Sequence, residues 1–407
     1  MTRKPASRRG VVWLGWKLVI AFSVSLCLLA LLRIQLQYRS VATLAPPLSV
    51  ALRDYSGDRP KVAFLFLARR DLPLDFLWDS FFKGVDQANY SVYVHSVPGF
   101  VFNEETTRSQ YFYNRQLNNS IKVIWGESSM IAAERLLFAS ALEDLSNQRF
   151  VLLSDRSASL RIINHLMLSF AGLHSLVYSL YYVLRYMTLA IYTDMLSHHR
   201  GVLWIGDCNS EPFEISHFLH TKETRYSVNM SSVIPEEKWR KGSQWISVIR
   251  SHAEVIVNDG IVFPVFKKFC KRAPPLGSQE AWLFFRQNRR NCIPDEHYVQ
   301  TLLTMCGLEN EMERRTLTYT VWNVSGSKYE TQTWHPVTFT FENSGPGQIK
   351  EIKKIDHVYY ETESRTEWCK ADSKPVPCFL FARKFTEGAA MRLVKEGLIG
   401  SSKNITL

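Results

Sequence analysis

Two adjacent carboxylates, Asp295 and Glu296, have the clearest potential for acid–base chemistry. They follow Pro294 and precede a helix-like apolar pattern over residues 299–305. A carboxylate in this position can act as a general base and take a proton from an attacking hydroxyl group. It can also simply cap the helix N-terminus, which is the commoner role of acidic residues there. The residues alone leave both roles open.

A pair of cations, Arg383 and Lys384, forms a second candidate site. It follows the apolar, strand-like residues 378–382. Arginine can bind a phosphate through two hydrogen bonds and lysine binds it as a point charge, so the pair could hold an anionic group. The alternative interpretation is a solvated basic pair at the end of a strand.

Motifs for binding metal ions or nucleotide phosphates are missing from the sequence. It contains no Asp-x-Asp, no Gly-x-Gly-x-x-Gly and no P-loop. Glu361-Thr-Glu363 comes nearest to a metal-binding acidic pair, and an exposed strand is the preferred interpretation of it. We therefore expect no metal or other cofactor. Arg and Lys side chains would then neutralise any phosphate that the protein binds.

The elements that must position these residues follow an alternating pattern. Apolar runs and amphipathic runs predict strands and helices in turn, with strands over 62–68, 90–95, 121–126 and 150–155 and helices over 73–85 and 132–144. This alternation is typical of a doubly wound α/β sheet, in which ligands bind at the carboxyl ends of the strands. Those ends carry Arg69, Arg70, His95, Glu127 and Asp155.

The N-terminal part of the chain carries most of the formal charge of +11. Eight Lys and Arg residues and no acidic residue lie in residues 1–53. Seven of the eight flank a stretch over 11–32 that is apolar except for Lys17. This pattern predicts a cytosolic tail (1–10), a transmembrane signal-anchor (11–32), a stem (33–60) and a lumenal domain (61–407). The remaining +3 is ordinary for a soluble domain, so we expect no nucleic-acid partner.

Two further patterns are compatible with a lumenal domain. Six cysteines follow the apolar stretch, an even number in a compartment where disulfides persist. Five Asn-x-Ser/Thr sites could carry glycans, at Asn89, Asn118, Asn229, Asn323 and Asn404.

Ten segments of the sequence, in the same order, resemble the plant-type branch of the core-2/I-branching β-1,6-N-acetylglucosaminyltransferase family. They cover 61–155 and about 221–395, and they are residues 61–82, 91–99, 125–142, 150–155, 233–257, 263–272, 291–303, 315–323, 357–369 and 376–385. The resemblance implies a GT-A (Rossmann-like) glycosyltransferase domain in a type II, single-pass Golgi membrane protein. It also implies inverting transfer of a GlcNAc-like sugar from a UDP-sugar to a glycan or glycoprotein, without a divalent metal.

The resemblance assigns roles to several residues. Glu296 resembles the family's general base, and Asp295 then becomes its capping or orienting neighbour. Arg383 and Lys384 are the best candidates for holding the diphosphate, because Cys369 and Cys378 have the spacing of a disulfide hairpin found in mammalian relatives. In those relatives an arginine within the hairpin and a lysine beyond it bind the diphosphate. Lys374 inside this hairpin is a further candidate, although it does not match the family's position.

Other donor-site candidates have simple alternatives. Glu127 resembles a family glutamate near the donor site, and Arg69 and His95 could touch the nucleotide from strand ends. Trp239 and Trp245 flank a basic segment that could stack a sugar or a uracil ring, or they could be a buried pair beside a solvated turn.

Residues 156–220 depart from the family pattern. Within them, residues 166–184 are apolar and long enough to span a bilayer. We interpret 156–220 as an insertion or replacement in the lumenal domain. The alternative function is therefore a catalytically inactive isoform, or a two-span membrane protein without transferase activity.

Overall fold

The computed structural model describes residue 25 and residues 59–160, 201–203, 225–274, 279–286, 291–314, 316–321, 336–360, 365–371 and 374–398. The chain divides into two compact units, Met1–Tyr55 and Ser56–Leu407, and the second carries all the elements below. Apart from residue 25, the predicted signal-anchor (11–32) lies outside the described residues, as does the apolar stretch 166–184. Among the helices of the described part, none is long and apolar enough to cross a membrane.

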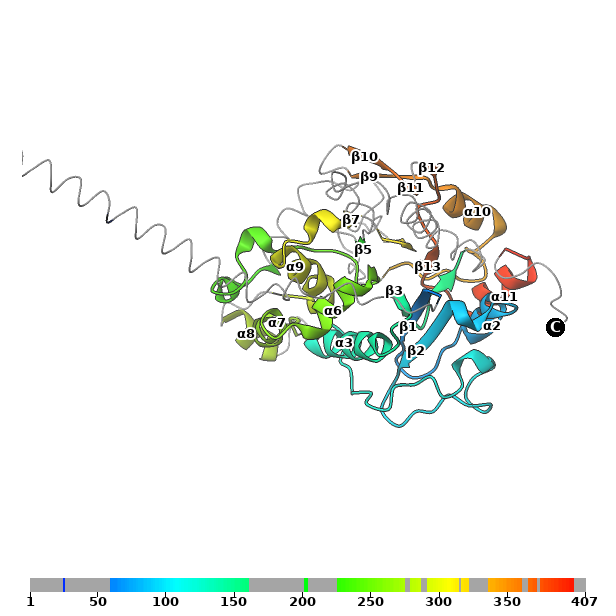
Figure 1. The fold of residues 1–407 in the computed structure, drawn as a ribbon, viewed down its shortest axis with the longest axis horizontal. Coiled ribbons are helices and arrows are strands. Elements are labelled where there is room, and N and C mark those ends of the chain that lie inside the picture. Colours follow the sequence, from blue (N-terminus) through cyan, green and yellow to red (C-terminus); the bar gives the residue numbers. More distant parts are fainter. Residues whose placement is uncertain are drawn as a thin grey trace, which may run out of the picture. The chain divides into compact units, whose positions relative to one another are not determined.

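A six-stranded mixed sheet forms the centre of the second unit (Figure 1). In spatial order its strands are β2 (Tyr90–His95), β1 (Lys61–Leu67), β3 (Asn147–Ser154), β6 (Ser247–Ile249), β5 (Gly201–Leu203) and β7 (Met312–Arg314). β1 lies parallel to β2 and β3, whereas β6 runs antiparallel to β3 and β5. The predicted α/β class is therefore confirmed, with a mixed rather than a purely parallel sheet.

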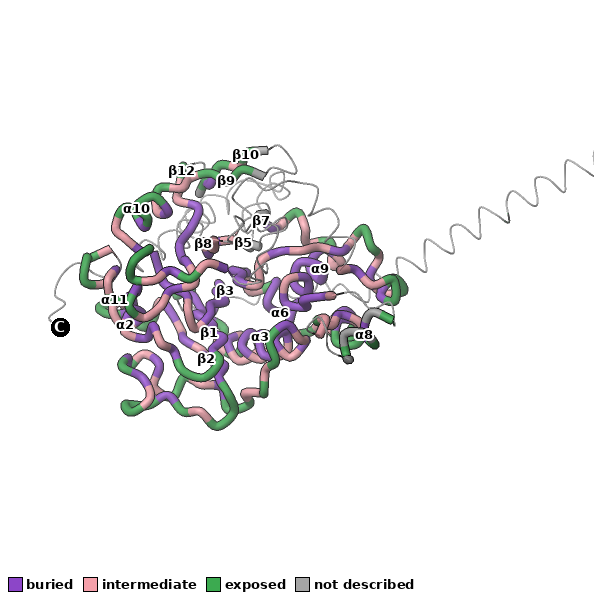
Figure 2. The backbone as a smooth tube through the Cα atoms, turned by 180° about the vertical axis from the view of Figure 1, so that it is seen from behind, coloured by how far each residue is buried: buried purple, intermediate pink, exposed green. Residues whose placement is uncertain are grey.

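Helices cover both faces of this sheet. As a result, β1 and β3 are buried along nearly their whole length (Figure 2). On one face, α2 (Asp75–Phe82) places Trp78 against Phe64 and Phe66 of β1, with ring centroids 6.3 and 4.9 Å apart. On the other face, α3 (Ser128–Leu142) packs against β1, β2 and β3, and α6 (Arg250–Asn258) packs against α3 and β3. The sequence of β1 is apolar on both faces because both are covered.

The remaining helices and strands complete the unit. The helices are α7 (Val262–Phe269), α8 (Gln279–Arg286), α9 (Tyr298–Met305), α10 (Pro346–Lys354) and α11 (Glu387–Lys395). A second sheet has the strand order β4 (Ala158–Ser159), β13 (Phe381–Arg383) and β8 (Thr318–Thr320). One two-stranded sheet pairs β9 (His357–Tyr360) with β10 (Arg365–Trp368). Another pairs β11 (Lys370–Ala371) with β12 (Lys374–Pro375). β4 and β5 lie inside the stretch 156–220, so parts of it belong to these sheets.

Most of the predicted elements between residues 61 and 155 are present, but the predicted strand over 121–126 is wrong. These residues form a loop that leads into α3. Ile124 and Trp125 are 58% and 42% exposed, so the apolar run is not a buried strand. The backbone of β2 bridges to Gln116 instead, which leaves 121–126 outside the sheet.

Candidate active site

Glu296 lies at the end of a short 3-10 helix, η6 (Pro294–Glu296), directly before α9. Its carboxylate oxygen Oε2 accepts a hydrogen bond from Nη1 of Arg225 at 2.5 Å. The backbone carbonyl of Glu296 accepts a hydrogen bond from the N–H of Gly242, which fixes the turn against the segment that precedes β6. The Glu296 side chain is 25% exposed, so a substrate hydroxyl can reach it.

Asp295 does not cap α9, contrary to one of its two predicted roles. The N-cap position of α9 is His297, and no side chain makes a capping hydrogen bond there. Asp295 is instead buried, with 6% of its surface exposed. Burial, followed by the neighbouring charge of Glu296, raises the pKa of Asp295 to about 7.

A cluster of four cations lies where β1, β3 and β13 end, and we call Arg69, Arg156, Arg383 and Lys384 the basic cluster. Nε of Arg69 donates a hydrogen bond to Asp155 at 3.0 Å. Burial lowers the pKa of Lys384, and the nearby positive charges of the other three members lower it further. Like charges held together in this way favour binding of an anion. The structure thus brings together three predicted site residues, Arg69, Arg383 and Lys384.

Arg383 is the most deeply placed member of the basic cluster. Its guanidinium carbon lies 4.6 Å from the ring centroid of Trp245, a cation–π contact. Burial lowers the pKa of Arg383 to about 10, although Asp155 and Asp295 act in the opposite direction. Trp245 and Trp239 are 8% and 3% exposed, so both rings are buried and neither offers an exposed platform for a sugar.

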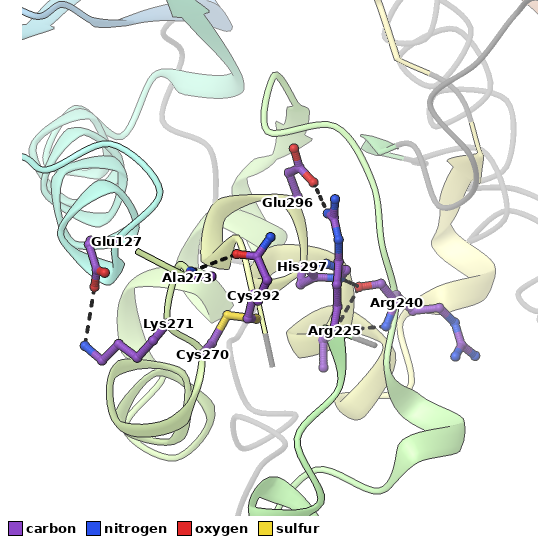
Figure 3. Close-up of a disulfide and its surroundings, with 11 residues drawn as sticks. Glu127, Arg225, Arg240, Cys270, Lys271, Ala273, Cys292, Glu296 and His297 are labelled. Atoms are coloured by element: carbon purple, nitrogen blue, oxygen red, sulfur yellow. Dashed lines mark hydrogen bonds and ion pairs between the residues drawn. A yellow bond between two sulfur atoms is a disulfide. The ribbon is translucent and has the colours of Figure 1, made fainter. Parts of the chain in front are cut away.

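Glu127 belongs to a different group of residues from the basic cluster. Its carboxylate forms an ion pair with Lys271 at 3.4 Å. In Figure 3 this pair lies on the opposite side of the Cys270–Cys292 disulfide from Glu296 and Arg225. Arg272, the next residue, stacks over the partly exposed ring of Trp125 at 4.2 Å. The described contacts of Glu127 are therefore those of an ion pair that joins the start of α3 to the end of α7.

The expected disulfide between Cys369 and Cys378 is present. Lys374 lies in the hairpin between these cysteines, where β12 pairs with β11, and its side chain lies outside the described residues.

His95 is buried beneath the end of β2 and is not exposed at the strand end. It is 1% exposed, and its Nε2 accepts a hydrogen bond from the N–H of Ile121 at 3.1 Å. Burial lowers the pKa of His95 to about 4, so the ring is neutral near pH 7. The histidine holds the loop that replaces the predicted strand 121–126.

Four residues near the site were not found from the sequence. Arg156 follows the strand-end residue Asp155, so its position was a usable signal. Arg225, Gln244 and Glu134 had none, because they lie at different distances along the chain and meet only in the folded protein. Nε2 of Gln244 donates a hydrogen bond to the buried carboxyl of Glu134 at 2.7 Å.

Comparison with known proteins agrees with this arrangement. The family model described as "Branch: Core-2/I-Branching enzyme" matches residues 62–181 and 208–353. Only 182–207 of the expected departure over 156–220 are unmatched, so that expectation was too wide: 156–181 and 208–220 follow the family model. The protein "Glycosyltransferase BC10" of Oryza sativa subsp. japonica is 44% identical over 358 residues, which cover 85% of this chain and 79% of that protein. With most of its sheet, Glu296 and Arg225 inside the matched ranges, the chain belongs to the Core-2/I-branching enzyme family.

Proposed function

We propose that the protein is an inverting, metal-independent glycosyltransferase with a GT-A domain in the Golgi lumen, which transfers a GlcNAc-like sugar from a UDP-sugar to a glycan or glycoprotein. Membership of the Core-2/I-branching family and the similarity to a protein named as a glycosyltransferase support transfer of a sugar. The observation that carries the proposal is the grouping of an accessible carboxylate, Glu296, with a partly buried basic cluster. The two are linked electrostatically, because Asp295 next to Glu296 interacts with Arg383.

Glu296 would act as the general base. Since Arg225 binds Oε2, we assign the acceptor proton to Oε1. As the proton moves to Glu296, the acceptor oxygen bonds to the anomeric carbon and the bond from that carbon to the diphosphate breaks on the opposite face. The configuration at the anomeric carbon therefore inverts.

The basic cluster would hold the leaving UDP. Negative charge grows on the diphosphate as the bond to the sugar breaks, and fixed cations at that place lower the barrier. Arg383 offers a planar fork for two phosphate oxygens and Lys384 a point charge. In this proposal the cations replace the metal ion that other sugar transferases use, so the reaction needs no divalent metal.

Release of UDP from a panel of UDP-sugars, with UDP-GlcNAc among them, tests the base and the metal together. We expect the wild-type chain to release UDP equally well with and without EDTA. Glu296→Gln should lower kcat by at least about 100-fold, because a neutral amide cannot accept the proton. Glu351→Gln is the matched control, since Glu351 is exposed and pairs only with Lys354 of the same helix among the described residues.

Three results of the same assay would contradict the proposal. Equal activity of Glu296→Gln and wild type would exclude Glu296 as the base. Activity lost in EDTA and restored by Mn²⁺ would exclude the metal-independent mechanism. Absence of transfer by the wild type from every donor would favour the inactive isoform.

A further inference from the structure

Two buried charged atoms near the base have no hydrogen-bond partner among the residues that the structure describes. They are Oδ1 of Asp295 and Nε of Arg383. The two groups interact electrostatically, since each charge favours the charged form of the other. Buried polar atoms are nearly always satisfied, so such a pair at a candidate active site needs an explanation.

A second buried carboxyl lies behind Asp295. Glu134, on the α3 face that packs against η6, is 2% exposed and accepts the hydrogen bond from Gln244. Burial, followed by the charge of Asp295, raises the pKa of Glu134 well above its usual range. Glu134, Asp295 and Glu296 therefore form a row of three interacting carboxyls, which cannot all be ionised near neutral pH.

The other ionisable groups that face this row have fixed charges near pH 7. Arg225 supplies a positive charge beside Glu296 and Asp295. His297 stays neutral because burial lowers its pKa well below the usual range, and its Nδ1 is hydrogen-bonded to the carbonyl of Arg240. Tyr298 of α9, which faces Glu134, stays neutral because burial raises its pKa well above the usual range.

We propose that Asp295, supported by Glu134, is a positioning residue that couples the diphosphate-binding Arg383 to the base Glu296. The inference rests on the proposed function, because it takes Arg383 as a ligand of the diphosphate. In the free protein the positive charge of Arg383 favours an ionised Asp295. A bound diphosphate neutralises Arg383, and Asp295 then takes up a proton from solvent.

Protonation of Asp295 has a direct consequence for Glu296. With Asp295 and Glu134 both neutral, Glu296 is the only negative charge of the row, held in place by Arg225. Departure of UDP restores the charge of Arg383, and Asp295 returns its proton to solvent. Donor binding and proton uptake are thus linked, so the affinity for a UDP-sugar should fall as the pH rises through about 7.

Binding of UDP-GlcNAc to the full-length chain in detergent, measured by calorimetry between pH 5.5 and 8.5, tests the coupling. This probe is a diphosphate diester, so its own charge stays constant over that range. For the wild type we expect the Kd to rise by up to about tenfold from pH 6 to pH 8, as release of one proton requires. For Asp295→Asn, whose side chain is always neutral, the Kd should stay within about twofold over the same range.

A second variant and a control protect the test against a folding defect. Glu134→Gln keeps a neutral hydrogen-bonding group for Gln244 and removes no charge, because burial already raises the pKa of Glu134 well above its usual range. This variant should therefore keep the pH dependence of the wild type. Glu351→Gln should follow the wild type.

The outcomes separate the two proposals. An unchanged pH dependence in Asp295→Asn overturns the coupling and leaves the proposed function intact, and so does loss of the pH dependence in Glu134→Gln. Failure of the wild type to bind UDP-GlcNAc or any other UDP-sugar at every pH overturns the proposed function, and the coupling with it.

Discussion

Burial separates the titratable side chains near the sheet edge into two groups. Glu296 and Lys384 keep contact with solvent and can meet a substrate. His95, Glu134 and Asp295 are almost fully enclosed, so each influences the site through its neighbours. The sequence shows that a residue follows a strand, but it does not show which way the side chain points. It therefore cannot distinguish the exposed side chains from the enclosed ones. For this reason the sequence alone makes His95 a candidate for contact with the nucleotide, although its side chain is buried.

The buried ring of His95 predicts a loss of stability in acid. Its folded pKa of about 4 lies below the ordinary 6.5, so the unfolded chain binds more protons between these values and stability falls as the pH drops through this window. The full effect is about 3 kcal/mol. His95→Gln, whose side-chain oxygen can still accept from Ile121, should lose less stability in urea unfolding between pH 6.5 and 4. The exposed His357→Gln is the control, and parallel pH profiles of His95→Gln and wild type would contradict the prediction.

The elements that could be predicted are those with a clear local pattern. β1, β2, α2 and α3 follow from apolar runs or amphipathic spacing, with errors of a few residues at their ends. The loop 121–126 could not be predicted, because an apolar run has the pattern of a buried strand. The sequence does not show that some of these apolar side chains are exposed. The sequence also does not indicate that β6 pairs with β3 in antiparallel orientation, because the three residues of β6 pair with a strand about a hundred positions earlier.

The candidate site shows the same limit. Glu296, Arg383 and Lys384 were found because each stands beside a recognisable apolar segment. Arg225 and Glu134 became visible only in the fold, because their roles depend on contacts with residues 71 and 110 positions away.

The Cys270–Cys292 disulfide joins the end of α7 to the segment that leads into η6 and Glu296. Both cysteines are buried, and 22 residues separate them along the chain. Replacing both by Ala should lower the free energy of unfolding by about 3 kcal/mol, because the unfolded chain gains freedom. It should also lower kcat, since η6 loses an anchor.

The Cys369–Cys378 pair provides the comparison for that experiment. It closes only 9 residues, so its removal should cost slightly less stability in guanidinium unfolding. A Cys270→Ala/Cys292→Ala protein with unchanged kcat would show that the disulfide does not hold the base in position.

At the scale of the whole molecule, pairing within the sheet restricts how the chain can meet a membrane. β3 ends before the apolar stretch 166–184 and β6 begins after it, yet the two strands pair at Arg149–Ile249, Phe150–Val248 and Val151–Ser247. Strands of one sheet lie on one side of a bilayer. A single crossing by residues 166–184 would place β3 and β6 on opposite sides of the bilayer, so the two-span alternative predicts that these strands do not pair in the cell.

Glycan positions test this topology directly. Asn118 lies before the apolar stretch and Asn229 after it, and both are exposed. If the signal-anchor places the whole second unit in the lumen, mass spectrometry of the protein from a plant secretory pathway should find glycans on both sites, and Asn118→Gln and Asn229→Gln should each remove one glycan. A glycan on Asn118 together with an unmodified Asn229, even when an additional acceptor site is introduced beside the exposed Val228, would place the two halves on opposite sides of the membrane. That result would require β3 and β6 to be apart in the cell, and both the sheet and the active site built on it would have to be abandoned.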